Sequence, residues 1–395
     1  MSEFETTGPE RAGPERRPRV CVVGSGWRFT GGLSHYTCRL AGALADRSEV
    51  SALLMRRLLP RALYPGRARV GVKTAALDYD ERVDVFDGVD WYWLPSLFGA
   101  LRRLRRNRPD TVVFQWWTGT VAHTYLVLAA AARARGARVV VEFHEVQDTG
   151  EIRIPFVAAY TRRVLGALLR RSDAFLVHSE HDRQLLGDLF DLSGRPVTVV
   201  PHGPFDHYAV THRPSPDGVF RLLFFGLIRP YKGLDVLIDA FHRLAPEEVS
   251  SFHLTVVGET WEGCTEPIEK IEASPYRDRI TLVNRYVSDE EAKAHFAEAD
   301  ALVLPYRRSS ASGPLHIAMS NGLPVVLSAV GGLVEAVGEY AGAVLVEPED
   351  VPGLADGLRK ARAAAGTRYP DPHTWQRNVE AILGRSAAAA EGGTR

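Results

Sequence analysis

Residues 221–244 read RLLFFGLIRPYKGLDVLIDAFHRL, and this stretch decides the fold class. Residues 221–225 form a short apolar run typical of a buried β-strand, whereas residues 234–244 carry apolar side chains at helical spacing. The loop between them contains glycine and two cations, Arg229 and Lys232. A strand, a short loop and a helix in this order predict one unit of a parallel sheet that is crossed by helices.

The same alternation continues on both sides of this unit. Before it, strands are expected at residues 20–23, 111–115, 139–143, 174–177 and 197–200, and helices at 33–45 and 158–169. After it, strands are expected at 252–257, 280–282, 301–304, 324–327 and 343–346, and helices at 351–365 and 374–384. The pattern predicts an α/β protein built from doubly wound parallel sheets.

A polar, proline-containing stretch at residues 212–218 separates the two sets of elements and predicts a domain boundary. The chain of 395 residues also exceeds what one hydrophobic core usually supports. We therefore expect a disordered leader at residues 1–17, a first domain at 18–211 and a second domain at 218–370. The last helix, at 374–384, is expected to pack back on the first domain.

The overall composition excludes several classes of function. Lys and Arg together number 48, as do Asp and Glu, so no net charge favours nucleic acid as a partner. Cys21, Cys38 and Cys264 lack the paired spacing of a zinc site or a thiol redox motif. The sequence has no run of about eighteen apolar residues and no signal-peptide core, which favours a cytoplasmic location.

Ligands of open α/β sheets bind at the carboxyl ends of the strands, so the loops there are candidate sites. Gly31 and Gly32 precede the first helix, with Ser34 beside them, and glycines there let backbone N–H groups approach a polar ligand. A mere turn remains the alternative. The dinucleotide fingerprint is not met, because Phe29 stands three residues beyond Gly26.

Histidines follow two of the expected strands. His144 comes directly after residues 139–143, where it would hydrogen-bond hydroxyl groups of a ligand or polarise a reacting centre. A structural role for His144 stays open. For His202, which follows residues 197–200, the structural role is favoured.

The basic loop of the opening stretch predicts a phosphate site. Arg229 and Lys232 lie between Gly226 and Gly233, directly before a helix. Two cations beside a helix N-terminus form a natural clamp for a diphosphate. Lysine is much rarer than arginine in this chain, which favours the clamp over a solvated basic turn.

A later helix is expected at residues 316–321. The small residues before this helix predict a second group of phosphate contacts. These residues are Ser310, Ser312, Gly313, Pro314 and Leu315. Their backbone N–H groups would form a nest with positive potential. The segment GGLVE, which ends at Glu335, repeats this device after the next strand.

Together, these segments resemble the motifs of the retaining GT-B glycosyltransferases of family 4. The matching segments are Gly31-Gly32, His144, residues 200–203 (VPHG), 229–233 (RPYKG), 299–305 (ADALVLP), 322–326 (GLPVV) and 331–335 (GGLVE). Each segment alone is a weak signal, but their order along nearly the whole chain is specific. The resemblance implies two Rossmann-like domains that face each other across an interdomain cleft, the first for the acceptor and the second for the donor.

The resemblance also implies a hexosyl- or glycosyltransferase of the EC 2.4 class. Such an enzyme moves a sugar, with retention, from a nucleotide-diphosphate sugar to a hydroxyl acceptor without a metal ion or other cofactor. The catalytic residues would be His144, Arg229 and Lys232. The donor contacts would be Gly226, Arg285, Tyr286, Val287, Ser310, Ser312, Gly313, Pro314, Leu315 and Glu335, and the acceptor-side loop would be Gly31, Gly32 and Ser34.

One departure from the family concerns two glutamates, eight residues apart, that usually stand in the segment aligned with residues 309–317. Neither is present here, so Ile317 and its neighbour His316 leave the binding of the ribose to another group. Residues 310–313 resemble the Ser-x-Ser-Gly loop of active subfamilies, which favours sequence divergence over a loss of activity. Two alternatives therefore stay open, namely an inactive relative that acts as a binding or scaffold protein, and a nucleotide-sugar epimerase or phosphorylase of the same architecture.

A basic amphipathic stretch, LFGALRRLRR, begins at Leu97 and ends at Arg106. As a helix, it would lie on an anionic bilayer and bring a lipid-linked acceptor to the cleft, which suggests a membrane-peripheral protein. A solvated helix face is the more frequent explanation of such a pattern. Further arginines would enlarge the patch, namely Arg162, Arg163, Arg170 and Arg171.

Overall fold

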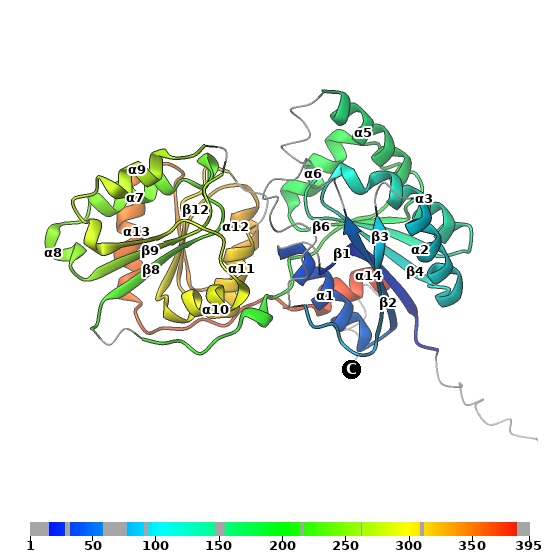
Figure 1. Cartoon of the computed structure of the whole chain (residues 1–395), viewed down its shortest axis with the longest axis horizontal. Coiled ribbons are helices and arrows are strands. Elements are labelled where there is room, and N and C mark those ends of the chain that lie inside the picture. Colours follow the sequence, from blue (N-terminus) through cyan, green and yellow to red (C-terminus); the bar gives the residue numbers. More distant parts are fainter. Residues whose placement is uncertain are drawn as a thin grey trace, which may run out of the picture.

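The computed structural model describes residues 16–27, 32–57, 77–90, 94–146, 155–214, 217–261, 263–308 and 312–384. The chain forms two α/β lobes, each built around one sheet (Figure 1). Every strand pair in the described part of the chain is parallel. The expected doubly wound α/β fold is therefore confirmed. Of the expected leader, residues 1–15 lie outside the described ranges.

The first lobe contains a seven-stranded sheet with the strand order β3-β2-β1-β4-β5-β6-β7. Its strands are β1 (Arg19–Ser25), β2 (Glu49–Arg57), β3 (Val83–Asp90), β4 (Thr111–Trp116), β5 (Arg138–Phe143), β6 (Ala174–Val177) and β7 (Val197–Val199). Helices cover both faces, so the central strands β4 and β6 are buried along their whole length. The order reverses between β1 and β4, which makes this the switch point of the sheet.

Two strands of this sheet, β2 and β3, were not expected. Leu53, Leu54 and Met55 in β2 are good helix formers, and β3 contains three aspartates and a glycine, which are rare in strands. Tertiary contacts decide both structures, because β2 pairs with the whole length of β1 through Glu49–Met55, and β3 pairs with β2.

The helices of the first lobe connect these strands. They are α1 (Gly32–Ala45), α2 (Leu94–Asn107), η2 (Gly119–Val121), α3 (Ala122–Arg133), α5 (Pro155–Leu169) and α6 (Glu180–Leu189). Helix α6 begins with a side-chain cap, because the Ser179 hydroxyl accepts a hydrogen bond from the Asp182 N–H. Helices α2, α3 and α5 follow one another across one face of the sheet, with α3 in contact with both of the others.

The second lobe contains a six-stranded sheet with the order β10-β9-β8-β11-β12-β13. Its strands are β8 (Phe220–Phe225), β9 (Phe252–Val257), β10 (Ile280–Val283), β11 (Ala301–Leu304), β12 (Val325–Ser328) and β13 (Ala343–Val346). Its helices are η4 (Pro230–Lys232), α7 (Leu234–His242), α8 (Pro246–Val249), α9 (Glu266–Glu272), η5 (Arg277–Arg279), α10 (Asp289–Glu298), α11 (Gly313–Ser320), α12 (Gly331–Val337) and α13 (Val351–Ala363). The switch point lies between β8 and β11.

Segments from both ends of the second lobe cross to the first. The short helix η3 (Asp206–Tyr208) lies in the connection between the sheets. Helix α14 (Gln376–Leu383) returns to the first lobe, where Val379 and Ile382 join the core that includes Tyr36. The Asn378 side chain donates hydrogen bonds to the Tyr36 hydroxyl and to the Pro201 carbonyl. Figure 1 shows α14, in red, beside the blue helix α1.

Candidate active site

The loops that leave the switch point of the second sheet pack closely on one another. The loop after β8 contains Gly226, with φ 117°, and Gly233, with φ 64°. Both values lie in the region that side chains rarely adopt. A Cβ atom at Gly233 would collide with the backbone carbonyl of Pro305, which follows β11. Glycine is therefore required where the basic loop crosses the end of β11.

Two cations of this loop lie on aromatic rings. The Lys232 ammonium is 3.8 Å from the centroid of the Tyr306 ring, and the Arg229 guanidinium carbon is 4.8 Å from the Trp261 ring. Among the described residues, neither cation has a carboxylate within 4.0 Å, and the buried Arg229 Nε has no hydrogen-bond partner. Burial lowers the pKa of Lys232 to about 8, and the positive charge of Arg229 acts in the same direction. Two uncompensated positive charges at this place favour an anionic ligand.

The N-terminus of α11 lies at the same switch point. Ser312 is its buried N-cap residue, and its hydroxyl lies 3.4 Å from the Tyr306 hydroxyl, whose ring contacts Lys232. Gly313, Pro314 and Leu315 form the first turn, in which the unpaired N–H groups of a helix are found. Ser310 lies outside the described residues. The helix N-terminus and the two cations thus add positive potential to one small region.

The segment after β10 is divided between surface and core. Arg285 forms an ion pair with Glu291, with Nη2 and Oε1 2.6 Å apart, and Tyr286 is exposed. The Val287 side chain is buried in the core of the second lobe. A nucleoside that meets this segment would therefore contact the Tyr286 ring or the backbone, and not the Val287 side chain.

Glu335 connects the two lobes in this structure. Its carboxylate accepts hydrogen bonds from the N–H groups of Glu180 and His181 at the N-terminus of α6. The helices α6 and α12 are in contact at this place. A carboxylate is favourable at a helix N-terminus, so Glu335 stabilises this arrangement of the lobes.

In the first lobe, the expected glycine loop is described only in part. Gly31 lies outside the described residues, and Gly32 is the first residue of α1. The buried Ser34 hydroxyl is 2.7 Å from the Ser25 hydroxyl at the end of β1. The side chain of Ser34 thus ties the start of α1 to β1.

Three histidines gather at the carboxyl ends of the neighbouring strands β5, β6 and β7. His144 follows β5, His178 follows β6, and His202 lies three residues after β7. His144 Nδ1 is 3.2 Å from His178 Nε2, and the His178 and His202 ring centroids are 4.2 Å apart. His178 was not foreseen, although a histidine close after each of three successive strands was a signal that could have identified the cluster. The structure also places His202, for which the sequence favoured a structural role, in this cluster.

A buried polar network lies beneath these histidines. The Tyr36 hydroxyl donates a 2.5 Å hydrogen bond to Glu142 Oε1, and the Gln115 amide donates to Glu142 Oε2 at 3.4 Å. Burial raises the pKa of Glu142 to about 7. Burial also lowers the pKa of His178 to about 4 and that of His144 well below its usual value, so these imidazoles are neutral near pH 7.

His316 of α11 joins the histidine cluster to the second lobe. Its ring stacks on His202 with centroids 4.9 Å apart, and on Phe205 with centroids 5.6 Å apart. His316 lies one turn after Gly313. The first turn of α11 therefore connects the histidine cluster to the helix N-terminus beside the two cations. The histidine cluster and the N-terminus of α11, beside the cationic loop, therefore lie at one junction between the lobes.

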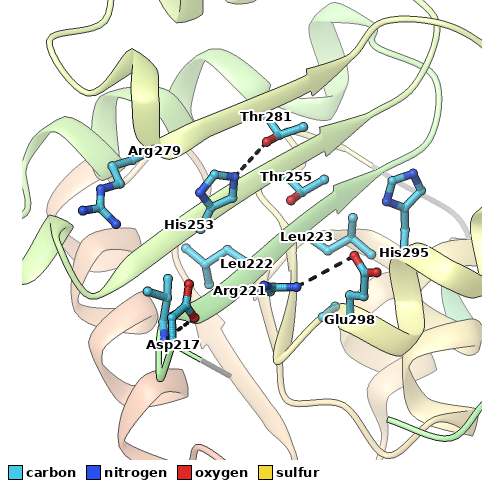
Figure 2. Close-up of a pocket in the computed structure, with 12 residues that line it drawn as sticks. Asp217, Arg221, Leu222, Leu223, His253, Thr255, Arg279, Thr281, His295 and Glu298 are labelled. Atoms are coloured by element: carbon cyan, nitrogen blue, oxygen red, sulfur yellow. Dashed lines mark hydrogen bonds and ion pairs between the residues drawn. The ribbon is translucent and has the colours of Figure 1, made fainter. Parts of the chain in front are cut away.

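A separate pocket of about 380 Å³ lies toward the ends of the strands opposite to the candidate site. It is formed at the amino ends of β8, β9 and β10, where His253 donates to or accepts from Thr281 and Arg221 faces Glu298 (Figure 2). Ligands of parallel sheets bind at the carboxyl ends of the strands, so we do not assign this pocket to the active site.

Across the described residues, every helix lacks either the length or the apolar character needed to span a bilayer. Within α2, Arg103 and Arg106 form ion pairs with Asp84, and Arg102, Arg105 and Arg106 are exposed. Only part of the basic stretch is therefore presented to the surroundings.

Comparisons with known proteins agree with this architecture. Residues 31–203 match the glycosyl transferase 4-like domain, and residues 219–363 match the glycosyl transferases group 1 domain. The D-inositol 3-phosphate glycosyltransferase of Stackebrandtia nassauensis is 27% identical over 95% of this chain and 91% of its own length. The glycogen synthase of Mycobacterium tuberculosis is 26% identical over 90% of this chain and 86% of its own.

Solved structures show the same fold. Sucrose-phosphate synthase from Thermosynechococcus elongatus has a TM-score of 0.60 with 17% identity, over 93% of this chain and 94% of its own. The two sheets, their junction and the matched domains define a GT-B glycosyltransferase. The chain belongs to the group 1 nucleotide-sugar glycosyltransferases of family 4, which confirms the resemblance found in the sequence and the assignment to the EC 2.4 class.

Proposed function

We propose that this glycosyltransferase binds the diphosphate of its nucleotide-sugar donor between Arg229, Lys232 and the N-terminus of α11. The observation that carries this proposal is the pair of cations that lie on aromatic rings without a carboxylate partner among the described residues. Residues 218–370 would then form the donor domain, and residues 18–211, with α14, the acceptor domain.

The chemistry of this arrangement is electrostatic. Negative charge develops on the leaving diphosphate as its bond to the anomeric carbon breaks, and preorganised cations and N–H groups stabilise that charge. Arg229 and Lys232 supply the positive charge that a metal ion supplies in other transferases, so this step needs no metal ion. We propose retention at the anomeric carbon, with the departing phosphate taking the proton of the acceptor hydroxyl.

The acceptor would lie between α1 and the histidine cluster. His144 would orient an acceptor or sugar hydroxyl, and Gly32 begins the helix that faces the junction. The Stackebrandtia relative carries D-inositol 3-phosphate in its name, so phosphorylated polyols are the first acceptors to test. Glu335 would contact the donor once its hydrogen bonds to α6 are released.

A panel of nucleotides tests this function. Calorimetric titration with UDP, GDP and ADP is expected to give one-to-one binding for at least one of them, and the matching sugar nucleotides are then incubated with acceptors. Formation of a glycoside supports a transferase. Binding without transfer to any acceptor would favour the scaffold protein, and isomerised sugar nucleotide would favour the epimerase.

The affinity for the diphosphate should depend on pH through Lys232. A bound dianion stabilises the protonated amine and raises its pKa above the value of about 8 in the free protein. Binding therefore takes up a proton above pH 8, and affinity should fall by up to about tenfold per pH unit there but stay level below it. Titration calorimetry from pH 6.5 to 9.5 measures the slope.

Lys232→Arg is the control for this experiment, because arginine stays charged throughout the range. The variant should bind the nucleotide with little dependence on pH. An equal slope in both proteins would show that another group takes up the proton.

We also propose that the first lobe contacts an anionic membrane through α2 and α5. Phe98 is 70% exposed and lies on the same face of α2 as Arg102, and Phe156 of α5 is 82% exposed near Tyr160. Both phenylalanines stand in the first two turns of helices that leave the carboxyl edge of the sheet. Helices α2 and α5 both contact α3. Exposed aromatic side chains and arginines on such helices suit the headgroup region of a bilayer.

Vesicle flotation tests the membrane contact. The protein should bind vesicles that contain phosphatidylglycerol but not pure phosphatidylcholine, and a variant with Phe98→Ser and Phe156→Ser should bind several-fold less. Leu345→Ser, at an exposed apolar residue of the second lobe, is the matched control and should bind as the parent does. Equal flotation of the double variant and the parent would rule this surface out.

A further inference from the structure

We propose that His144, His178 and His202 form a binding site for a divalent transition-metal ion such as zinc. The three side chains each offer one ligand atom, and these atoms all lie within 4.8 Å of one another. They come from the ends of three adjacent strands of one sheet, so the backbone fixes their relative positions. The inference does not rest on the proposed diphosphate site.

The separation of the ring nitrogens suits a tetrahedral ion. Zinc binds histidine nitrogen at about 2.0–2.1 Å, which places two ligands of a tetrahedral site about 3.3 Å apart. His144 Nδ1 and His178 Nε2 are already 3.2 Å apart. His202 would move by a rotation of its side chain to complete a set of three, with its buried Nδ1 lacking any hydrogen-bond partner among the described residues.

The hydrogen bonds around His178 also match those of a metal ligand. His178 Nδ1 lies 3.1 Å from the Val200 carbonyl oxygen and must donate to it, so Nε2 carries the lone pair. A backbone carbonyl that fixes the tautomer in this way is the usual partner of a metal-bound histidine. In the metal-free protein, His144 Nδ1 must then donate to His178 Nε2. On binding, the ion takes the place of that hydrogen, and the proton moves to His144 Nε2, which has no hydrogen-bond partner among the residues that the structure describes.

The side chains packed against the three histidines add an acidic group and restrict the positions of the imidazole rings. The buried carboxyl group of Glu142 has Oε1 4.0 Å from His178 Nε2, so an ion at the cluster would have an acidic group close to its ligands. The Tyr36 ring meets His144 and His202 edge-on, with centroids 4.5 and 4.6 Å away. Three neutral imidazoles provide nitrogen donors of the kind that zinc binds.

The position of this site gives the ion a role at the acceptor side of the junction. Three protein ligands leave the fourth position of a tetrahedral ion open for an oxygen atom. His144 and His202 are only half-buried, and His202 stacks on His316 of the second lobe. The open position would therefore take water or an oxygen of the acceptor, away from the cations of the diphosphate site.

Metal binding by the full-length protein tests the proposal. After treatment with a chelator and dialysis, titration with Zn²⁺ should show one ion per chain, and Co²⁺ should give the visible bands of a tetrahedral complex. His178→Gln and His202→Gln should each weaken Zn²⁺ binding at least about tenfold. His253→Gln, at a partly exposed histidine of the second lobe, is the control and should bind as the parent does.

The result that would overturn the proposal is the absence of a stoichiometric site, or equal affinity in His178→Gln, His202→Gln and the parent. If the His178 variant does not fold, the cobalt spectrum of the parent decides. Tetrahedral bands that disappear in His202→Gln support the site, and bands of six-coordinate Co²⁺ or no bands exclude it. Nucleotide binding is measured in parallel, so failure of the metal site is distinguished from failure of the diphosphate site.

Discussion

Lys232→Met is expected to reduce kcat/KM for sugar transfer by about 10²–10³-fold, the usual effect of removing one preorganised group that stabilises transition-state charge. Methionine retains an unbranched side chain on the Tyr306 ring but lacks the positive charge beside the leaving diphosphate. Arg229→Met should act in the same direction, because its guanidinium lies on Trp261 without a carboxylate partner among the described residues. Steady-state kinetics with the donor identified from the nucleotide panel measures both effects.

The stability of Lys232→Met separates this explanation from simple damage to the fold. The folded-state pKa of about 8 lies below the unfolded value near 10.5, so holding the charged amine in the folded protein is unfavourable at pH 7. Removing it should leave the free energy of unfolding unchanged or raise it. Lys360→Met, at an exposed lysine of α13, is the matched control. Activity of Lys232→Met within about threefold of that control would contradict the proposed clamp.

Gly233→Ala is expected to lower the free energy of unfolding by about 3 kcal/mol or more. Gly233 has φ 64°, and a Cβ atom there would meet the backbone carbonyl of Pro305, which cannot move as the end of a flexible side chain would. The basic loop would have to shift away from β11, so donor binding should be lost as well. Denaturant unfolding and nucleotide titration measure the two effects.

Gly366→Ala is the matched control for this change. Gly366 has φ 78°, similar to that of Gly233, but its surroundings are open within 4 Å of the added atom. It should lower stability by only about 1 kcal/mol, the effect of the backbone conformation alone. Equal effects of the two substitutions would show that the contact with Pro305 does not hold the loop.

The central part of the fold could be predicted from the sequence because β-branched and apolar runs alternate clearly with helical segments there. The run at residues 221–225 and the helix after Gly233 are examples, observed as β8 and α7. The strands β2 and β3 could not, because Leu54 and Met55 favour helix and Asp84 and Asp87 disfavour strand. Pairing of β2 with β1 and of β3 with β2, contacts between residues distant in sequence, decides their structure.

The candidate site was only partly predictable. The basic loop could be recognised because its glycines and cations are adjacent in sequence, and the switch point of the sheet places them beside α11. The histidine cluster depends on the order β5-β6-β7, which brings together residues 34 and 24 positions apart along the chain. The contact of Glu335 with α6 depends on how the lobes meet, which no local pattern encodes.

The structure shows what occupies the segment in which the family usually has its two glutamates. Ile317, which stands where the resemblance places one of them, is 6% exposed and belongs to the core of the second lobe. His316 points toward His202 and Phe205 and so connects the lobes. Neither side chain holds a ribose in this arrangement, so we propose that the Tyr286 segment takes this role.

The most direct measurement is a structure of the protein with the nucleoside diphosphate that binds in the titration. We expect the two phosphates to lie within hydrogen-bonding distance of Lys232, the Arg229 guanidinium and the first N–H groups of α11. A nucleotide bound elsewhere, with Arg229 and Lys232 still on Trp261 and Tyr306 and remote from both phosphates, would contradict this expectation.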